Sequence, residues 1–165
     1  MSLNTRLVSL AAIVLAAGIV SSGCEMFESS SKSDTTAAGT ASLYDRLGKE
    51  PAIKAVVDDF VTRAAQDPKV NFFRQGQPRE WKPSDADVST FKTRLIEFIS
   101  MATGGPQKYS GKDMKTVHTG MKITNDEFNA LAADLAASLT KLGVQAKEQA
   151  ELIAIVETTR KDIVE

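Results

Sequence analysis

The chain carries a single copy of each side chain that most often does chemistry at a metal or as a nucleophile. His118 is the only histidine and Cys24 the only cysteine among its 165 residues. A lone imidazole can bind a metal or transfer a proton. A lone cysteine excludes an internal disulfide and a cysteine–histidine zinc cluster. No glycine-rich phosphate loop is present, and a Ser-His-Asp set would have to use the same histidine. Chemistry that needs an imidazole therefore depends on His118.

Cys24 stands at the end of a short apolar segment. Arg6 precedes an apolar run over residues 7–20, which is short for a membrane-spanning helix and typical of a secretory signal peptide. Ser21-Ser22-Gly23 follow, and small residues directly before a cysteine resemble the lipobox of bacterial lipoproteins, where the cysteine becomes the lipidated first residue. We expect residues 1–23 to be a signal peptide and Cys24 to be lipidated. The alternative is an ordinary signal peptide or an uncleaved anchor, with Cys24 incidental.

Composition divides the rest of the chain into a linker and one domain. Residues 24–41 hold the cysteine and then small polar residues without periodicity, as in a flexible linker. Residues 42–165 are long enough for a single folded domain. We expect this domain to lie in the cell envelope, anchored to the periplasmic or another extracytoplasmic face of a membrane. The 20 basic and 21 acidic residues are balanced and form no basic block, so no nucleic-acid partner is expected.

The apolar residues of the domain recur at helical spacing, and no useful stretch alternates as a half-buried strand would. Helices are expected over 43–47, from Pro51 to 66, from about 85 to 102, within 110–121, from 124 to 142 and from about 146 to 163. Thr124 and Glu127 form a capping box that opens the fifth of these. One face of the second carries Ile53, Val56, Val57, Phe60, Val61 and Ala64. The domain is therefore expected to be all-α.

Several short motifs follow one another in a fixed order through this domain. They are Leu43 to Gly48, Ile53 to Phe60, Asp67-Pro68, Phe72-Phe73, Gly104-Gly105-Pro106, Tyr109 to Met114, and Val117 to Met121. None is diagnostic alone, but their order resembles that of the group I truncated hemoglobins over the whole domain. The resemblance implies a truncated globin fold, a two-over-two helical sandwich around heme.

The resemblance also assigns residues on one side of the heme. It implies that His118 is the proximal iron ligand and that Phe73 and Phe128 contact the porphyrin. Met114 lies one helical turn before His118 and is expected to line the same side. An imidazole is a common iron ligand, and heme needs apolar walls between helices. The alternative for His118 is a surface residue without a ligand role.

On the opposite, distal side the chain departs from the family. A tyrosine commonly follows the phenylalanine that matches Phe60, and a glutamine often faces the ligand from the third helix. Here the corresponding residues are Val61, Phe91 and Leu95, which have no hydrogen-bond donor. A donor stabilises bound O2 by about 1–3 kcal/mol, so its loss should speed O2 release roughly tenfold to more than a hundredfold. We expect a penta-coordinate iron that discriminates against O2.

A long polar loop, Arg74 to Ser84, could change that expectation. In one interpretation it is solvated, with Trp81 covering the core or the heme edge. In the other, Gln77 or Arg79 folds over the pocket and supplies a donor.

The sequence thus favours a heme protein that binds O2, NO or CO and receives electrons from an unidentified reductase. NO dioxygenation is known in this family, but the missing distal donor makes it a less favoured activity here. The alternative is a globin-like structural or interaction lipoprotein that has lost heme, against which the retained His118 argues.

Overall fold

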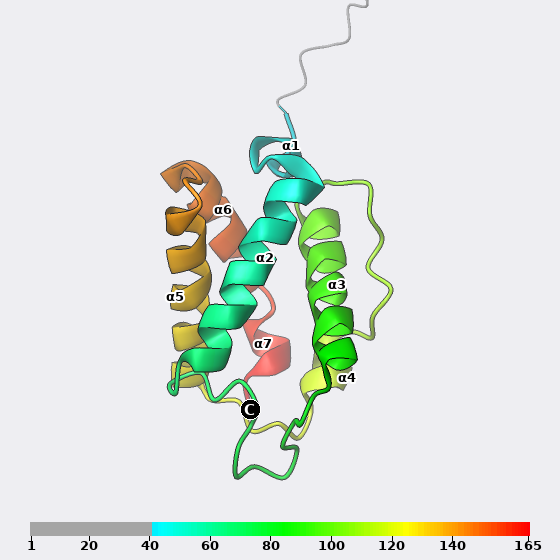
Figure 1. The fold of residues 1–165 in the computed structure, drawn as a ribbon, viewed down its shortest axis with the longest axis vertical. Coiled ribbons are helices and arrows are strands. Elements are labelled where there is room, and N and C mark those ends of the chain that lie inside the picture. Colours follow the sequence, from blue (N-terminus) through cyan, green and yellow to red (C-terminus); the bar gives the residue numbers. More distant parts are fainter. Residues whose placement is uncertain (1–40) are drawn as a thin grey trace, which may run out of the picture. The chain divides into compact units, whose positions relative to one another are not determined.

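The computed structural model describes residues 41–165, which contain seven α-helices and no β-strand (Figure 1). The helices are α1 (Leu43–Arg46), α2 (Lys49–Gln66), α3 (Asp85–Ala102), α4 (Met114–His118), α5 (Asn125–Lys141), α6 (Ala146–Glu157) and α7 (Arg160–Ile163). The all-α fold expected from helical spacing is confirmed. The predicted signal peptide, the predicted lipidation site Cys24 and nearly all of the predicted linker lie outside the described residues.

The helices form two packed pairs. α2 packs against α3, α5 packs against α6, and α2 also contacts α5, which joins the pairs into a two-over-two arrangement. Figure 1 shows α2 and α3 side by side, with α5 and α6 at the opposite edge. The short α1 rests on α2 and α6, and the short α4 packs against α7. None of the helices from residue 41 onward is both long and apolar enough to cross a membrane.

The predicted apolar face of α2 forms the centre of the core. All six of its residues are buried, and Val57 and Ala64 have no exposed surface. α2 begins at Lys49, two residues before the predicted start, so Pro51 lies inside the first turn, where a missing N–H costs nothing. Gly48 precedes it with φ +93°, and a Cβ there would lie 2.8 Å from the Cβ of Ala52. Glycine is therefore required at this start.

The core continues from α2 to the other long helices. Ile99 of α3, Leu135 and Leu139 of α5, and Leu152 of α6 are each at most 5% exposed. A void of only about 10 Å³ remains among them, which can hold at most one water molecule. It is lined by Leu47, Ile53, Val56, Ile99, Leu139 and Leu152. This end of the domain is thus closely packed.

Capping boxes open two of the long helices. Thr124 and Glu127 cap α5 as predicted, and Ser84 with Asp87 caps α3 in the same way. In each box the hydroxyl accepts from the third N–H of the helix, and the carboxylate accepts from the backbone N–H of the cap residue. These caps set where both helices begin relative to the loops that precede them.

The expectation of one helix from about 146 to 163 is wrong. The chain forms α6, then a break at Thr158 and Thr159, then α7. The hydroxyls of both threonines donate to carbonyls three residues earlier, on Ile155 and Val156. Such local bonds compete with the helical ladder. The break gives α7 its own direction, and α7 is the helix on which α4 packs.

Replacing Leu139 with alanine should lower the free energy of unfolding by about 2–5 kcal/mol, because it removes a fully buried side chain and enlarges the apolar void beside it. Leu142, at the end of the same helix, is 43% exposed. Leu142→Ala is therefore the matched control and should change the free energy of unfolding by no more than about 0.5 kcal/mol. Urea unfolding followed by circular dichroism measures both. Equal losses in the two variants would contradict the core assignment.

Candidate functional site

His118 is the last residue of α4, and its ring is anchored within that helix. Its Nδ1 lies 2.7 Å from the backbone oxygen of Met114. Because a carbonyl oxygen only accepts, Nδ1 carries the hydrogen, and Nε2 keeps its lone pair. Burial lowers the pKa of His118, outweighing the Met114 hydrogen bond, and the nearby Arg79 cation lowers it further. The imidazole is therefore neutral near pH 7, with one nitrogen ready to bind a metal.

The helix that carries this imidazole is only one turn long. Asp113 caps it by accepting from the backbone N–H of Thr116 at 2.9 Å. Before the cap, the hydroxyl of Tyr109 donates to the carbonyl of Lys112 at 2.8 Å, and its ring packs on Phe98 of α3. A five-residue helix has few internal hydrogen bonds, so its position depends on the segments at its two ends.

Beyond His118, a non-helical segment over residues 119–123 is held by a buried arginine. Arg74 is 4% exposed and donates from Nε to the Met121 oxygen at 2.9 Å and from Nη2 to the Lys122 oxygen at 3.0 Å. Its Nη1 donates to Oε1 of Glu127 at 2.7 Å. One guanidinium thus connects the α2–α3 loop to the 119–123 segment and to the start of α5.

Glu127 serves two groups at once. One carboxylate oxygen accepts from Arg74, and the other accepts from the backbone N–H of Thr124 at 2.8 Å. Burial alone would raise the pKa of Glu127, but the Thr124 amide and the Arg74 guanidinium together hold this pKa below its ordinary value. The carboxylate is therefore ionised at neutral pH and neutralises the buried cation.

A second carboxylate holds the same segment from another direction. The side chain of Glu165 accepts from the backbone N–H of Gly120 at 2.7 Å and from that of Lys122 at 2.9 Å. The backbone N–H of Glu165 donates to the carbonyl of Ile123 at 2.9 Å. The hydrogen bonds that the Gly120 and Lys122 amides donate to its side chain hold the pKa of Glu165 below its ordinary value.

Arg79 reaches the same region from the α2–α3 loop. Its Nη1 lies 2.5 Å from the carbonyl oxygen of Thr119 and 3.4 Å from that of Val117. These two residues flank His118, so Arg79 lies beside His118, on the side expected to be proximal. The hypothesis that Arg79 folds over the distal pocket is not supported by this position.

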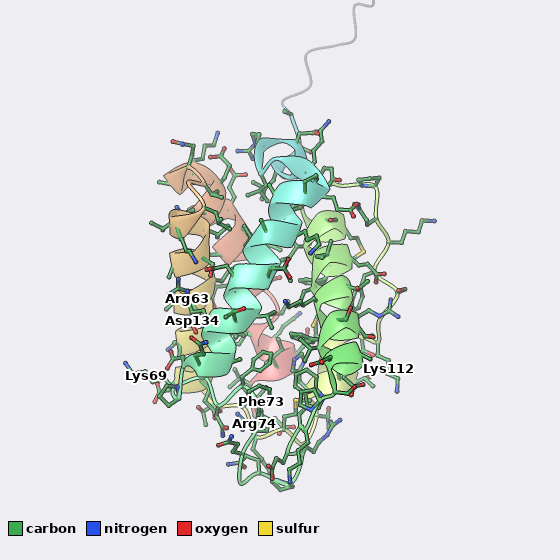
Figure 2. The ribbon with its side chains drawn as sticks, in the orientation of Figure 1. Arg63, Lys69, Phe73, Arg74, Lys112 and Asp134 are labelled. Atoms are coloured by element: carbon green, nitrogen blue, oxygen red, sulfur yellow. The ribbon has the colours of Figure 1, made fainter. Side chains whose placement is uncertain are left out.

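Three aromatic residues of the loop, Phe72, Phe73 and Trp81, form a cluster with Phe91 of α3. The ring centroid of Trp81 lies 5.5 Å from that of Phe91 and 5.7 Å from that of Phe72. The backbone N–H of Trp81 donates to the Phe73 carbonyl at 2.8 Å. The edge-to-face packing of such rings is favourable. Figure 2 shows Phe73 and Arg74 together at the turn that leads from α2 toward α3. Trp81 therefore packs against Phe91 of α3, and whether it also covers the heme edge stays a prediction.

The predicted distal residues lie in one apolar cluster. Val61 is 4% exposed in the core, and Phe91 and Leu95 are half-buried against the same core from α3. The cations next to them on α3 have carboxylate partners of their own. Lys92 Nζ lies 2.9 Å from Asp58 Oδ1, and Arg94 Nη1 lies 2.9 Å from Glu97 Oε2.

The other three side chains predicted to contact heme differ in how much of their surface is exposed. Phe73 and Met114 are half-buried, on the loop and on α4. Phe128 is 1% exposed, and the guanidinium of Arg160 lies 4.2 Å from its ring centroid. The contacts of these three side chains with heme stay predictions.

The residues present fit a heme. Among residues 41–165, no group of three His, Cys, Asp or Glu side chains could hold a metal ion. A metal at His118 therefore needs a group that supplies its other ligands, as a porphyrin does. α3 packs closely on α2 but on none of the other described helices. Several of its apolar side chains are only half covered by protein: Val88, Phe91, Leu95, Ile96 and Phe98. Such a face suits a large flat apolar ligand.

Sequence reasoning missed Arg74 and Glu165. Arg74 was one cation among several in a polar loop, and Glu165 lies 45 positions from its partner Gly120. The capping box found Glu127 but not its second bond to Arg74. The only signal in the sequence was an arginine directly after two phenylalanines, which is compatible with burial but does not indicate it.

Comparison with known proteins agrees with this geometry. The family model for bacterial-like globins matches residues 42–165. A group 1 truncated hemoglobin of Tetrahymena pyriformis is 36% identical over 73% of this chain and 93% of its own length. One from Mycolicibacterium paratuberculosis is 34% identical over 70% of this chain and 79% of its own.

Solved structures agree as well. The Fe(III) form of the Tetrahymena pyriformis truncated hemoglobin superposes with a TM-score of 0.65 at 34% identity, covering 75% of this chain and 98% of that one. The 2/2 hemoglobin of Synechococcus, in the cyanomet state and with covalently attached heme, gives 0.64 at 27% identity with the same coverage. The two-over-two fold and heme iron as the cofactor follow from these matches. The chain belongs to the bacterial-like globin family, and within it to the group 1 truncated hemoglobins, heme globins that bind diatomic gases such as O2.

Proposed function

We propose that this protein binds diatomic gases at a penta-coordinate heme iron whose one protein ligand is Nε2 of His118. The observation that carries the proposal is the bond from His118 Nδ1 to the Met114 carbonyl, which leaves Nε2 as the free nitrogen of the only imidazole in the chain. When bound, heme supplies an iron that accepts O2, NO or CO on the side opposite the imidazole. The chain has no second histidine to occupy that side.

The distal face is formed by Val61, Phe91 and Leu95, and it selects among the gases by lacking a donor. O2 becomes the most polar of the three on binding and gains most from a hydrogen bond. The pairing of Lys92 with Asp58 and of Arg94 with Glu97, and the position of Arg79 beside His118, support an apolar face. We therefore favour a protein whose affinity for O2 is low relative to NO or CO, rather than an NO dioxygenase, which must hold O2.

The proposed function also includes a cellular location and an electron donor. We place it in the cell envelope, with the domain attached to a membrane through a lipid on Cys24. An unidentified reductase keeps the iron ferrous, because the sequence indicates no second redox group in this chain.

His118→Ala should abolish or shift the Soret band of protein expressed with heme available, because the iron loses its protein ligand. Free imidazole added to the variant should restore the wild-type spectrum if the fold is intact. Absorbance spectroscopy measures both. An unchanged band in the variant would contradict the ligand assignment, and a wild-type protein without any band would favour the heme-free alternative.

Val61→Tyr should slow O2 release relative to Val61→Phe, because the two side chains differ only by the hydroxyl that can donate to the ligand. The expected ratio is about tenfold to more than a hundredfold, with a smaller change for CO. Flash photolysis and stopped-flow mixing give the rates. Gln77→Leu should leave O2 release unchanged; a large acceleration would identify Gln77 as a distal donor and refute the apolar pocket.

Cys24→Ser should move the protein from the membrane fraction to the soluble fraction or leave it as an unprocessed precursor. Mass spectrometry of the wild-type protein should find an amino terminus at a diacylglycerol-modified Cys24. More than one acyl chain is expected there, because a single chain gives only marginal membrane attachment. A free thiol at Cys24 in the mature protein would contradict this proposal.

A further inference from the structure

The 119–123 segment is fixed by side chains from distant parts of the chain rather than by regular structure. It follows His118 directly and belongs to no helix. Side chains bond to its backbone groups as follows: Arg79 to the Thr119 carbonyl, Glu165 to the Gly120 and Lys122 amides, and Arg74 to the Met121 and Lys122 carbonyls. The position of this segment therefore depends on tertiary contacts.

Arg74 is the most constrained of these side chains. It is 4% exposed, and its fork spans two adjacent carbonyls and one carboxylate. A lysine could not reproduce this pattern, because its ammonium is a point charge rather than a planar fork. The guanidinium thus fixes an orientation of the segment as well as a distance.

The backbone at this contact is held in an unfavourable conformation. Arg74 has φ +54° and Lys122 has φ +58°, in the left-handed region that residues other than glycine rarely adopt. Such residues persist where the surroundings over-determine them, and they gather at ligand-holding sites. Here one of the two supplies the guanidinium, and the other supplies a carbonyl that it binds.

The packing of α4 on α7 and the segments at the two ends of α4 hold His118 in the molecule. α4 has five residues and packs against α7, with no close packing on another described helix. The Met114 carbonyl fixes the ring within α4, but it does not fix α4 within the molecule. Resting on the proposed role of His118 as iron ligand, we infer that Arg74 and Glu165 are positioning residues for that ligand, which set the direction of Nε2 toward the iron by clamping the 119–123 segment.

The test compares Arg74→Met and Glu165→Ala with wild type in the full chain loaded with heme. Resonance Raman spectra of the ferrous, gas-free protein give the iron–histidine stretching band. Transfer of heme to an excess of apomyoglobin gives the rate of heme loss. Both variants should shift or broaden the band, and Arg74→Met should speed heme loss by roughly 10- to 100-fold, as expected for partners that orient a metal ligand. Hydrogen exchange of the apoprotein should be faster at the Gly120 and Lys122 amides in Glu165→Ala.

Arg46→Met is the matched control. Arg46 also joins distant segments through carboxylates, Glu148 and Glu151, but it does so between α1 and α6. It should lower stability without moving the iron–histidine band. A wild-type band in both clamp variants, or an equal shift in the control, would overturn the inference.

Glu165 is exposed, so Glu165→Ala decides the question if Arg74→Met does not fold. A wild-type protein without a Soret band would overturn the proposed function as well, whereas an unchanged band in heme-loaded variants overturns only this inference.

Discussion

A buried cation sets the geometry around the proposed iron ligand. Taking the Arg74 guanidinium out of water is costly, and it is tolerated here because each of its three nitrogens finds an acceptor. Those acceptors are two adjacent carbonyls, on Met121 and Lys122, and the carboxylate of Glu127. The chain must therefore bring residues 121–127 to one place beneath the α2–α3 loop. His118 lies three residues before Met121, so it can move little once Arg74 has bound the Met121 and Lys122 carbonyls.

The two sides of the proposed heme site are built from different chemistry. On the proximal side, backbone carbonyls and amides are held by charged side chains, and the Met114 carbonyl fixes which imidazole nitrogen is free. Around the distal residues, apolar side chains on α2 and α3 pack together, and the neighbouring cations pair with carboxylates. Polar contacts fix direction, whereas apolar contacts exclude water without favouring a polar ligand. This division is consistent with the proposed function, in which the iron ligand is firmly oriented and bound O2 receives no hydrogen bond.

The long loop between α2 and α3 serves both sides. Its aromatic residues pack on Phe91 at the start of α3, and its two arginines, Arg74 and Arg79, bind backbone groups on either side of Gly120. A loop of this length would ordinarily be mobile and tolerant of change. Here burial of one guanidinium and stacking of several rings tie it to two helices. The loop thus links the distal and proximal halves of the site.

The sequence by itself determined the helices apart from the break before α7, the buried face of α2 and the capping box at Thr124, because helical period and capping are local properties of the chain. The single histidine and the ordered motifs also identified the candidate iron ligand. The burial of Arg74 and the role of Glu165 were decided only by the tertiary structure. Each depends on groups far apart in sequence, such as Arg74 with Glu127 and Glu165 with Gly120. Local pattern carries no information about such pairs, because a charged residue in a loop looks the same whether water or protein surrounds it.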